Sequence, residues 1–94
     1  MHDLPQQMRA VAIDRFGGPE VLKVKSLPVP TPGPRDVLIR VAFAGIAEWD
    51  VYEQEGGFAS MLGEEPTFPY ILGSEGAGVV EAVGTEVERF SPGD

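Results

Sequence analysis

Short runs of alternating apolar and polar residues make up most of this chain, and they predict strands. Residues 36–46, DVLIRVAFAGI, give the strongest signal because their apolar side chains alternate between two faces. Residues 9–14 are expected to form a well-buried strand, and 21–27, where lysines separate apolar residues, a strand with one wet face. Residues 71–83 carry glycines inside a strand pattern, which indicates bulges or a close approach of two backbones.

The segment 47–54 has helical spacing instead. Trp49 and Glu53 stand four residues apart, and acidic residues occupy the first turn, where they complement the helix dipole. The glycine pair 56–57 is expected to end this helix, and residues 58–70, with their two prolines, are predicted to form a loop. The chain is therefore predicted to be mainly β, a small partly open barrel or sandwich with one short helix.

Charge is distributed unevenly along the 94 residues. The net charge is −8, yet residues 41–88 contain ten acidic side chains and no lysine or arginine. Such a segment repels phosphate backbones, which argues against a nucleic-acid partner, and otherwise serves as a solvated acidic face. No apolar run approaches the ~20 residues that span a bilayer, so we expect no membrane span. A cytoplasmic protein is the default expectation.

The scarcity of cysteine and histidine limits the chemistry further. The chain has no cysteine, and its single histidine is His2. These counts exclude a disulfide framework, a thiol nucleophile and a Ser–His–Asp triad, and they leave almost no ligands for a zinc site of the usual nitrogen and sulfur kind.

Several residues remain as candidates for a site. The glycine run 73–78 has the spacing G-x-x-G-x-G, the reverse of the dinucleotide fingerprint, and it enters a strand, which favours backbone packing over a phosphate cradle. Glu75 lies between apolar stretches, where it is either a site residue or a structural hydrogen-bonding group. Trp49 and Tyr52 fit packing at least as well as a site.

The order of several motifs identifies a resemblance. The sequence FGGPEVL, a proline-rich connector, DVLIRV, AGI-x-x-x-D and LG-x-E-x-AG-x-V-x-x-VG follow one another over residues 8–94. This pattern resembles the N-terminal part of the medium-chain dehydrogenase/reductase superfamily. The resemblance implies a GroES-like catalytic domain, an irregular β-barrel that would be incomplete here, and makes residues 1–7 an extension. It also implies a Rossmann domain, absent from these residues, that would bind most of the NADPH or NADH.

Departures from the family pattern suggest a subgroup. Where zinc alcohol dehydrogenases of this superfamily carry a cysteine and a histidine, this chain has Ala47 and Ser74. Alanine cannot bind zinc and serine is a poor ligand, so we expect no catalytic zinc; Glu75 of the same motif remains. Asp50 and Tyr52 match a pattern of the zinc-free quinone oxidoreductases and enone reductases.

The resemblance therefore implies the substrate-side domain of a zinc-independent NAD(P)H oxidoreductase that reduces quinones or α,β-unsaturated carbonyls. Tyr52 and Asp50 are the implied catalytic residues, with Ala47, Trp49, Ser74 and Glu75 at the substrate cleft. The 94 residues alone are expected to be inactive, and a homo-oligomer could form through the missing domain. Two alternatives stay open: a free-standing GroES-like binding or assembly module, and an alcohol dehydrogenase that has lost its zinc site.

Overall fold

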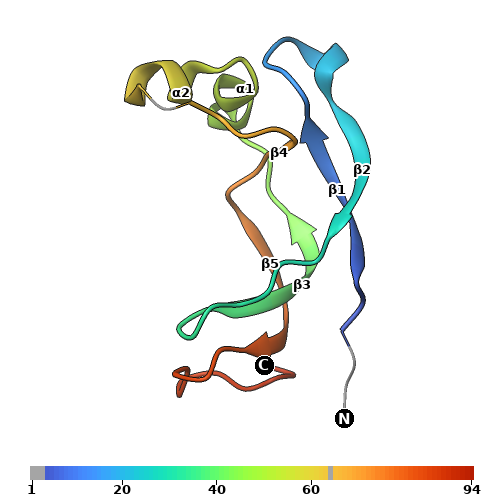
Figure 1. Cartoon of the computed structure of the whole chain (residues 1–94), viewed down its shortest axis with the longest axis vertical. Coiled ribbons are helices and arrows are strands. Elements are labelled where there is room, and N and C mark those ends of the chain that lie inside the picture. The colour runs from blue at the N-terminus through green and yellow to red at the C-terminus, as the bar shows by residue number, and fades with distance from the viewer. Residues whose placement is uncertain (1–3, 64) are drawn as a thin grey trace.

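The computed structural model describes residues 4–63 and 65–94, and strands dominate its secondary structure (Figure 1). Two α-helices and one 3-10 turn join them. In chain order the elements are β1 Gln7–Ile13, η1 Pro19–Val21, β2 Lys23–Pro28, β3 Val37–Ala44, α1 Glu48–Gln54, α2 Gly57–Leu62, β4 Tyr70–Ile71 and β5 Gly76–Val83.

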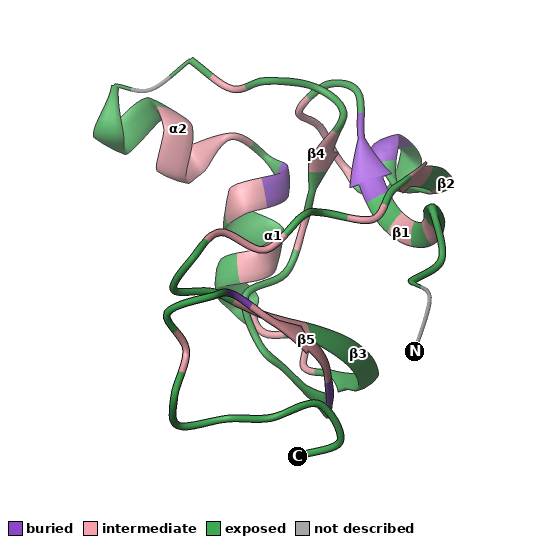
Figure 2. Cartoon of the chain, turned by 60° about the horizontal axis from the view of Figure 1, so that its bottom comes forward, coloured by how far each residue is buried: buried purple, intermediate pink, exposed green. Residues whose placement is uncertain are grey.

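A three-stranded antiparallel sheet with the order β2-β1-β4 forms one part of the molecule. β1 pairs with β2 along its length, and its last two residues, Ala12 and Ile13, pair with β4. Those two side chains are fully buried, and Val21 of η1 is almost so. Figure 2 shows this buried patch at the end of β1. Most of the small core therefore lies where β1 meets β4 and the turn after β1, and Val80 of β5 is buried in the other sheet.

The second sheet consists of β3 and β5 only, paired antiparallel with two register shifts. A Cβ at Gly78 would collide with the carbonyl oxygen of Arg40, because the two backbones approach closely there. This confirms the predicted bulges and close approach in residues 71–83. The chain's last turn folds back on β5, where the amide of Val80 donates to the carbonyl of Asp94 at 2.9 Å.

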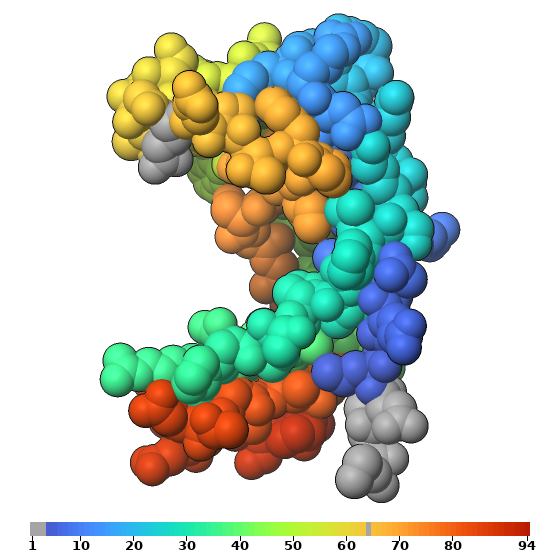
Figure 3. All heavy atoms as spheres, viewed as in Figure 1, coloured from blue at the N-terminus to red at the C-terminus, as the bar shows by residue number. Residues whose placement is uncertain are grey.

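The two parts give the molecule an elongated shape of 42 × 25 × 22 Å. The helices, β4 and the turn after β1 gather at one end, and the β3–β5 sheet with the last turn occupies the other. Figure 3 shows a wide hollow between the two ends on one side of the molecule. Within the described ranges the strands form two open sheets and no closed barrel. No described helix has the length and apolar character that a membrane crossing requires.

The expected strands are confirmed, with changes at their ends. The run 9–14 became β1, although only its last residues are well buried. The run 71–83 does not form one strand, because Gly73 adopts φ +105° and turns the chain from β4 in one sheet to β5 in the other. The expected wet face of β2 is less clear than its sequence suggested, since Val24 is exposed and Lys25 is half-buried.

The prediction of a loop over residues 58–70, and of a single helix, is wrong. Residues 57–62 form α2, bounded by Gly56 and Gly63 in the left-handed conformation at φ +88° and +68°. Phe58 of this helix packs edge-on against Tyr52 of α1 with ring centroids 4.9 Å apart, which supplies a tertiary contact of the kind that a six-residue helix needs. The glycine pair therefore ends one helix and begins another.

Candidate functional site

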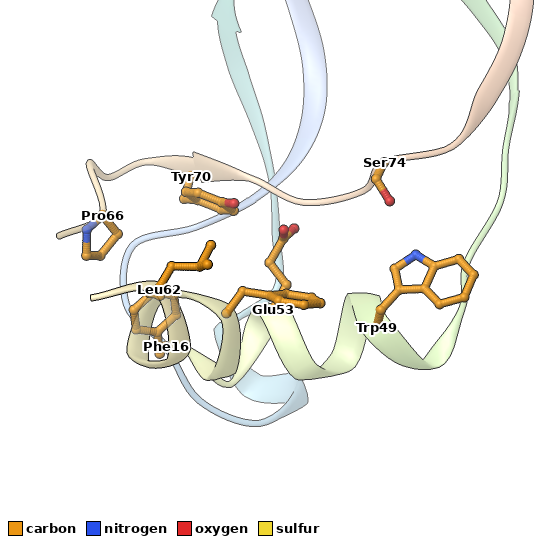
Figure 4. A pocket seen from close by; sticks show the side chains of 9 residues that line it. Phe16, Trp49, Glu53, Leu62, Pro66, Tyr70 and Ser74 are labelled. Atoms are coloured by element: carbon orange, nitrogen blue, oxygen red, sulfur yellow. The ribbon is translucent and has the colours of Figure 1, made fainter. Parts of the chain in front are cut away.

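A pocket of about 350 Å³ lies between the two helices and the segment that runs through β4 (Figure 4). Its wall is mostly aromatic and aliphatic, with one carboxylate and two hydroxyls, a serine hydroxyl and a tyrosine phenol, among the side chains. The lining residues are Phe16, Trp49, Glu53, Phe58, Ala59, Leu62, Pro66, Tyr70 and Ser74. Apolar walls with a few polar groups are typical of small-molecule sites, and this volume is at the lower end of their range.

The helix α1 contributes Trp49 and Glu53 to this pocket. Their spacing of four residues places both side chains on the same helix face. Ser74 and Tyr70 approach from the opposite wall, and the Glu53 side chain extends across the space toward that wall. Polar groups from two separate segments thus meet inside an apolar enclosure.

A carboxylate fixes the start of α1. Ala47 has no side chain that could cap the helix, so the Oδ2 atom of Asp50 accepts a 2.8 Å hydrogen bond from the Ala47 amide. This is half of a capping box, and it settles the direction in which the chain enters the helix. Asp50 therefore positions the helix that carries Trp49 and Glu53.

The end of α1 is held by Gln54, the one buried polar residue of the described chain. Its side-chain Nε2 atom donates to the backbone carbonyl of Gly17 at 3.2 Å, and the backbone amide of Gly17 donates to the backbone carbonyl of Gln54 at 3.1 Å. The next turn packs closely, since a Cβ at Gly56 would lie 2.8 Å from the Phe16 ring. The turn after β1 and the helix pair therefore form one unit around the pocket.

The structure separates the sequence-predicted site residues into two groups. Trp49 and Ser74 line the pocket, whereas Ala47 and Asp50 lie at the helix start. The ring of Tyr52 packs edge-on against Phe58 with centroids 4.9 Å apart, and it does not line the pocket. Glu75 is exposed, with its side chain beside Gly45 and its carbonyl accepting the Gly45 amide at 3.1 Å.

Glu53 is the pocket residue that the sequence analysis missed. The sequence counts it only as one of the acidic residues of the solvated segment 41–88, although its spacing from Trp49 places the two on one helix face. Phe16, Phe58 and Tyr70 were also missed, and no local pattern could have found them. They reach the pocket from three segments that only the fold brings together.

A second hollow of about 590 Å³ lies at the other end of the molecule, lined by residues 35, 37 and 86–90. It contains none of the sequence-predicted site residues. Across residues 4–63 and 65–94, no three histidine, cysteine or acidic side chains are grouped so that they could hold a metal ion.

Comparison with known proteins gives a consistent relationship. Residues 33–94 match the model of the alcohol dehydrogenase GroES-like domain. A quinone oxidoreductase of Pseudomonas aeruginosa is 46% identical over 79 residues, which are 84% of this chain and 23% of that protein. The chain spans about a quarter of the length of the curated relatives that it matches.

Solved structures share the fold. An NAD-dependent alcohol dehydrogenase superposes with a TM-score of 0.82 and 48% identity, covering 93% of this chain and 24% of that one. The Escherichia coli quinone oxidoreductase, solved as a complex with NADPH, gives a TM-score of 0.80 and 30% identity over 93% of this chain and 25% of its own. These matches confirm the expected mainly β, GroES-like fold.

Proposed function

We propose, because this chain belongs to the alcohol dehydrogenase GroES-like domain family and with it to the medium-chain dehydrogenase/reductase superfamily, that it forms the substrate-side part of an NAD(P)H-dependent oxidoreductase. The proposed reaction is reduction of a quinone or of an α,β-unsaturated carbonyl by hydride transfer. The observation that carries this proposal is the identity of 40–46% to quinone oxidoreductases over most of the chain.

The chain's own residues do not fit the cofactor phosphates. A Cβ at Gly76 would lie 3.2 Å from the carbonyl oxygen of Phe43, and Gly78 is pressed against the backbone of Arg40. The glycine run therefore serves strand pairing and leaves no cradle for a pyrophosphate, while residues 41–88 supply no cation. In the proposed enzyme the nicotinamide supplies the hydride, and its phosphates bind outside these residues.

The chemistry proposed for this chain does not require zinc. Alcohol oxidation benefits from a Lewis acid that lowers the pKa of the hydroxyl group, whereas a quinone or enone is already electron-poor. Ala47 and Ser74 stand where zinc-dependent relatives resembling this chain carry ligands, and neither can replace them.

The pocket gives individual residues different tasks in this proposal. Trp49 forms part of the wall that shields the substrate from water, and the Ser74 hydroxyl can donate to a carbonyl oxygen that gains negative charge. Asp50 is proposed as the residue that positions α1. Tyr52 of α1 packs on Phe58 outside the pocket lining, so it is proposed as a second donor only for a substrate that extends beyond the pocket. Glu75, the neighbour of Ser74 in the sequence, is proposed for the edge of the cleft, although it does not line the pocket.

A second candidate is an alcohol dehydrogenase that has lost its catalytic zinc. The observation that favours it is the 48% identity to an NAD-dependent alcohol dehydrogenase. The two candidates differ in the preferred reaction, because an alcohol dehydrogenase oxidises alcohols with NAD⁺ and the leading candidate oxidises NAD(P)H with a quinone or enone.

A chimera tests the proposed function. Residues 8–94 replace the matching first quarter of the Pseudomonas aeruginosa quinone oxidoreductase, with the unmodified enzyme as the control. We expect the chimera to oxidise NADPH with a quinone or enone and to keep that activity after dialysis against a zinc chelator. A folded chimera that binds NADPH but reduces neither substrate class would contradict the proposal, and loss of activity on chelation would contradict its zinc independence.

The role of Tyr52 has its own test in that chimera. If the phenol donates to the developing oxyanion, Tyr52→Phe should lower kcat more than it raises KM, by roughly tenfold to a thousandfold. Phenylalanine preserves the edge-on contact with Phe58, so the variant isolates the hydroxyl. An unchanged kcat/KM would leave Tyr52 as a packing residue and move the donor role to Ser74.

A further inference from the structure

Four aromatic rings and one carboxylate line the pocket. Phe16 comes from the turn after β1, Trp49 from α1, Phe58 from α2 and Tyr70 from β4. Glu53 is the acidic side chain among the residues described as lining this space. Rings attract positive charge through their π faces, and a carboxylate pairs with it directly, so the two features favour the same kind of ligand.

The surroundings of Glu53 sharpen this point. Its side chain is half-buried and extends from α1 toward the wall formed by Tyr70 and Ser74 (Figure 4). Within residues 4–63 and 65–94, its carboxylate has neither a hydrogen-bond donor nor an ion-pair partner. A carboxylate beside apolar rings loses part of its hydration, and the charge of a cationic ligand would compensate for that loss.

In the part of the chain that the structure describes, no lysine or arginine pairs with this carboxylate. Residues 41–88, which supply every pocket residue except Phe16, contain no lysine or arginine. Arg15 is next to Phe16 in sequence, but it does not line the pocket, and its guanidinium lies near Gly17 on the turn. The acidic segment also raises the local concentration of positively charged small molecules.

We propose that this pocket binds a small organic cation, a quaternary or protonated tertiary ammonium group, held by the aromatic rings and paired with Glu53. If this preference also holds for the substrate of the reaction, the substrate is a quinone or enone that carries an amine. This statement about the substrate rests on the proposed function, whereas the binding preference does not. The volume of about 350 Å³ admits one small molecule of this class.

A matched pair of probes tests the preference on the whole chain. Choline and 3,3-dimethyl-1-butanol have the same shape, and only choline is charged, so the alcohol titration contains sodium chloride equal to the choline chloride. Trp49 lines the pocket and is the chain's single tryptophan, which makes its fluorescence a direct reporter. We expect choline to bind more tightly than the alcohol by about threefold to tenfold.

Two variants identify the group responsible. Glu53→Gln should reduce the preference for choline to about twofold or less. Glu55→Gln removes the same charge from an exposed residue at the end of α1 that does not line the pocket, and it should leave the preference unchanged. Circular dichroism of each variant shows whether the fold is intact.

Each other outcome overturns the inference in a defined way. Equal affinity for the two probes, or no saturable change with either, contradicts a cation site. A preference that survives Glu53→Gln contradicts the pairing with Glu53 and assigns the attraction to the rings or to general charge. A preference that disappears in Glu55→Gln assigns it to general charge alone. None of these results determines whether the chimera reduces a quinone or enone, and an inactive chimera does not determine which probe binds. The two proposals can therefore fail separately.

Discussion

The two sheets of this molecule contain similarly apolar strands but bury them very differently. In β1, Ala12 and Ile13 are completely buried beneath the neighbouring strand and turn. In β3, Val41 and Phe43 are 61% and 77% exposed, although the alternation of β3 is the strongest strand signal in the sequence. Figure 2 shows exposed residues along much of β3.

This difference separates what makes a strand from what stabilises a sheet. Backbone pairing with β5 forms β3, yet the described residues cover little of its apolar surface. The other sheet gains a core because the turn after β1 and the helix pair pack beside it and are joined to each other through Gln54. The pocket belongs to this better-packed end.

A pair of isoleucines measures the difference directly. Ile13→Ala should lower the free energy of unfolding by about 2–5 kcal/mol, because it removes a fully buried side chain and leaves a cavity. Ile39→Ala, at a residue that is 45% exposed in β3, should cost at most about 1 kcal/mol. Urea denaturation followed by circular dichroism compares the two.

If Ile13→Ala does not fold, Ile13→Val provides the same comparison with an expected loss of about 0.5–1.5 kcal/mol. Equal losses at the two isoleucines would show that the β3 sheet is as well packed as the β1 sheet.

Gly78 tests whether the second sheet depends on backbone contact. Gly78→Ala places a methyl group against the carbonyl of Arg40 and should destabilise the chain by about 1–3 kcal/mol. Gly76→Ala meets the carbonyl of Phe43 at 3.2 Å, a distance that a small adjustment relieves, so its effect should be smaller. Thermal unfolding of both variants provides the measurement, and the reverse order would contradict the described pairing.

Asp50 tests the element that carries the pocket. Asp50→Ala removes the hydrogen bond to the Ala47 amide and should cost about 0.5–2 kcal/mol. Glu48→Ala removes an exposed acidic group from the same turn, where only the dipole interaction is lost, so its cost should be lower. The two variants are compared by urea denaturation, and equal costs would mean that Asp50 acts through charge alone.

The smallest effect concerns the edge of the first sheet. The Lys25 ammonium donates a 2.6 Å hydrogen bond to the Asp14 carboxylate and holds its pKa below the usual value, with Lys23 adding to the field. A lowered pKa in the folded state stabilises the fold above the unfolded pKa of ~3.9, and this gain disappears as the pH falls through the folded value.

Asp14→Asn should therefore lower the midpoint of thermal unfolding slightly at neutral pH. It should not change the midpoint at a pH below the pKa of Asp14 in the folded chain. The pair is exposed, so salt should weaken the effect. A midpoint difference that stayed constant down to the lowest pH would contradict this account of Asp14.

The sequence predicted the elements better than it predicted the site. The alternation of β3 and the spacing of α1 depend on neighbouring residues, so both were found with small errors at their ends. The helix α2 was missed because its short, glycine-flanked sequence gives little local signal, and its contact with α1 is made through Phe58 and Tyr52, which only the fold brings together.

The site depends on segments that are distant in the sequence. Trp49 and Ser74 were identified through motifs of a resembling family, whereas Phe16 and Tyr70 become neighbours of Glu53 only in the folded chain. Tyr52 and Glu53 are adjacent on α1, yet one packs on Phe58 and the other enters the pocket. Side chains of neighbouring helical residues point about 100° apart, and a sequence motif does not show which of the two faces the pocket.

The most direct test of the central claim asks where a substrate-like molecule binds. The ¹⁵N-labelled chain is titrated with 2-cyclohexen-1-one, a small enone that finds no cysteine to alkylate. The proposed site predicts the largest chemical-shift changes at the Trp49 indole N–H and at the amides of Phe58 and Ser74. Changes confined to the exposed face of β3, around Val41 and Phe43, would contradict the placement of the substrate site in this pocket.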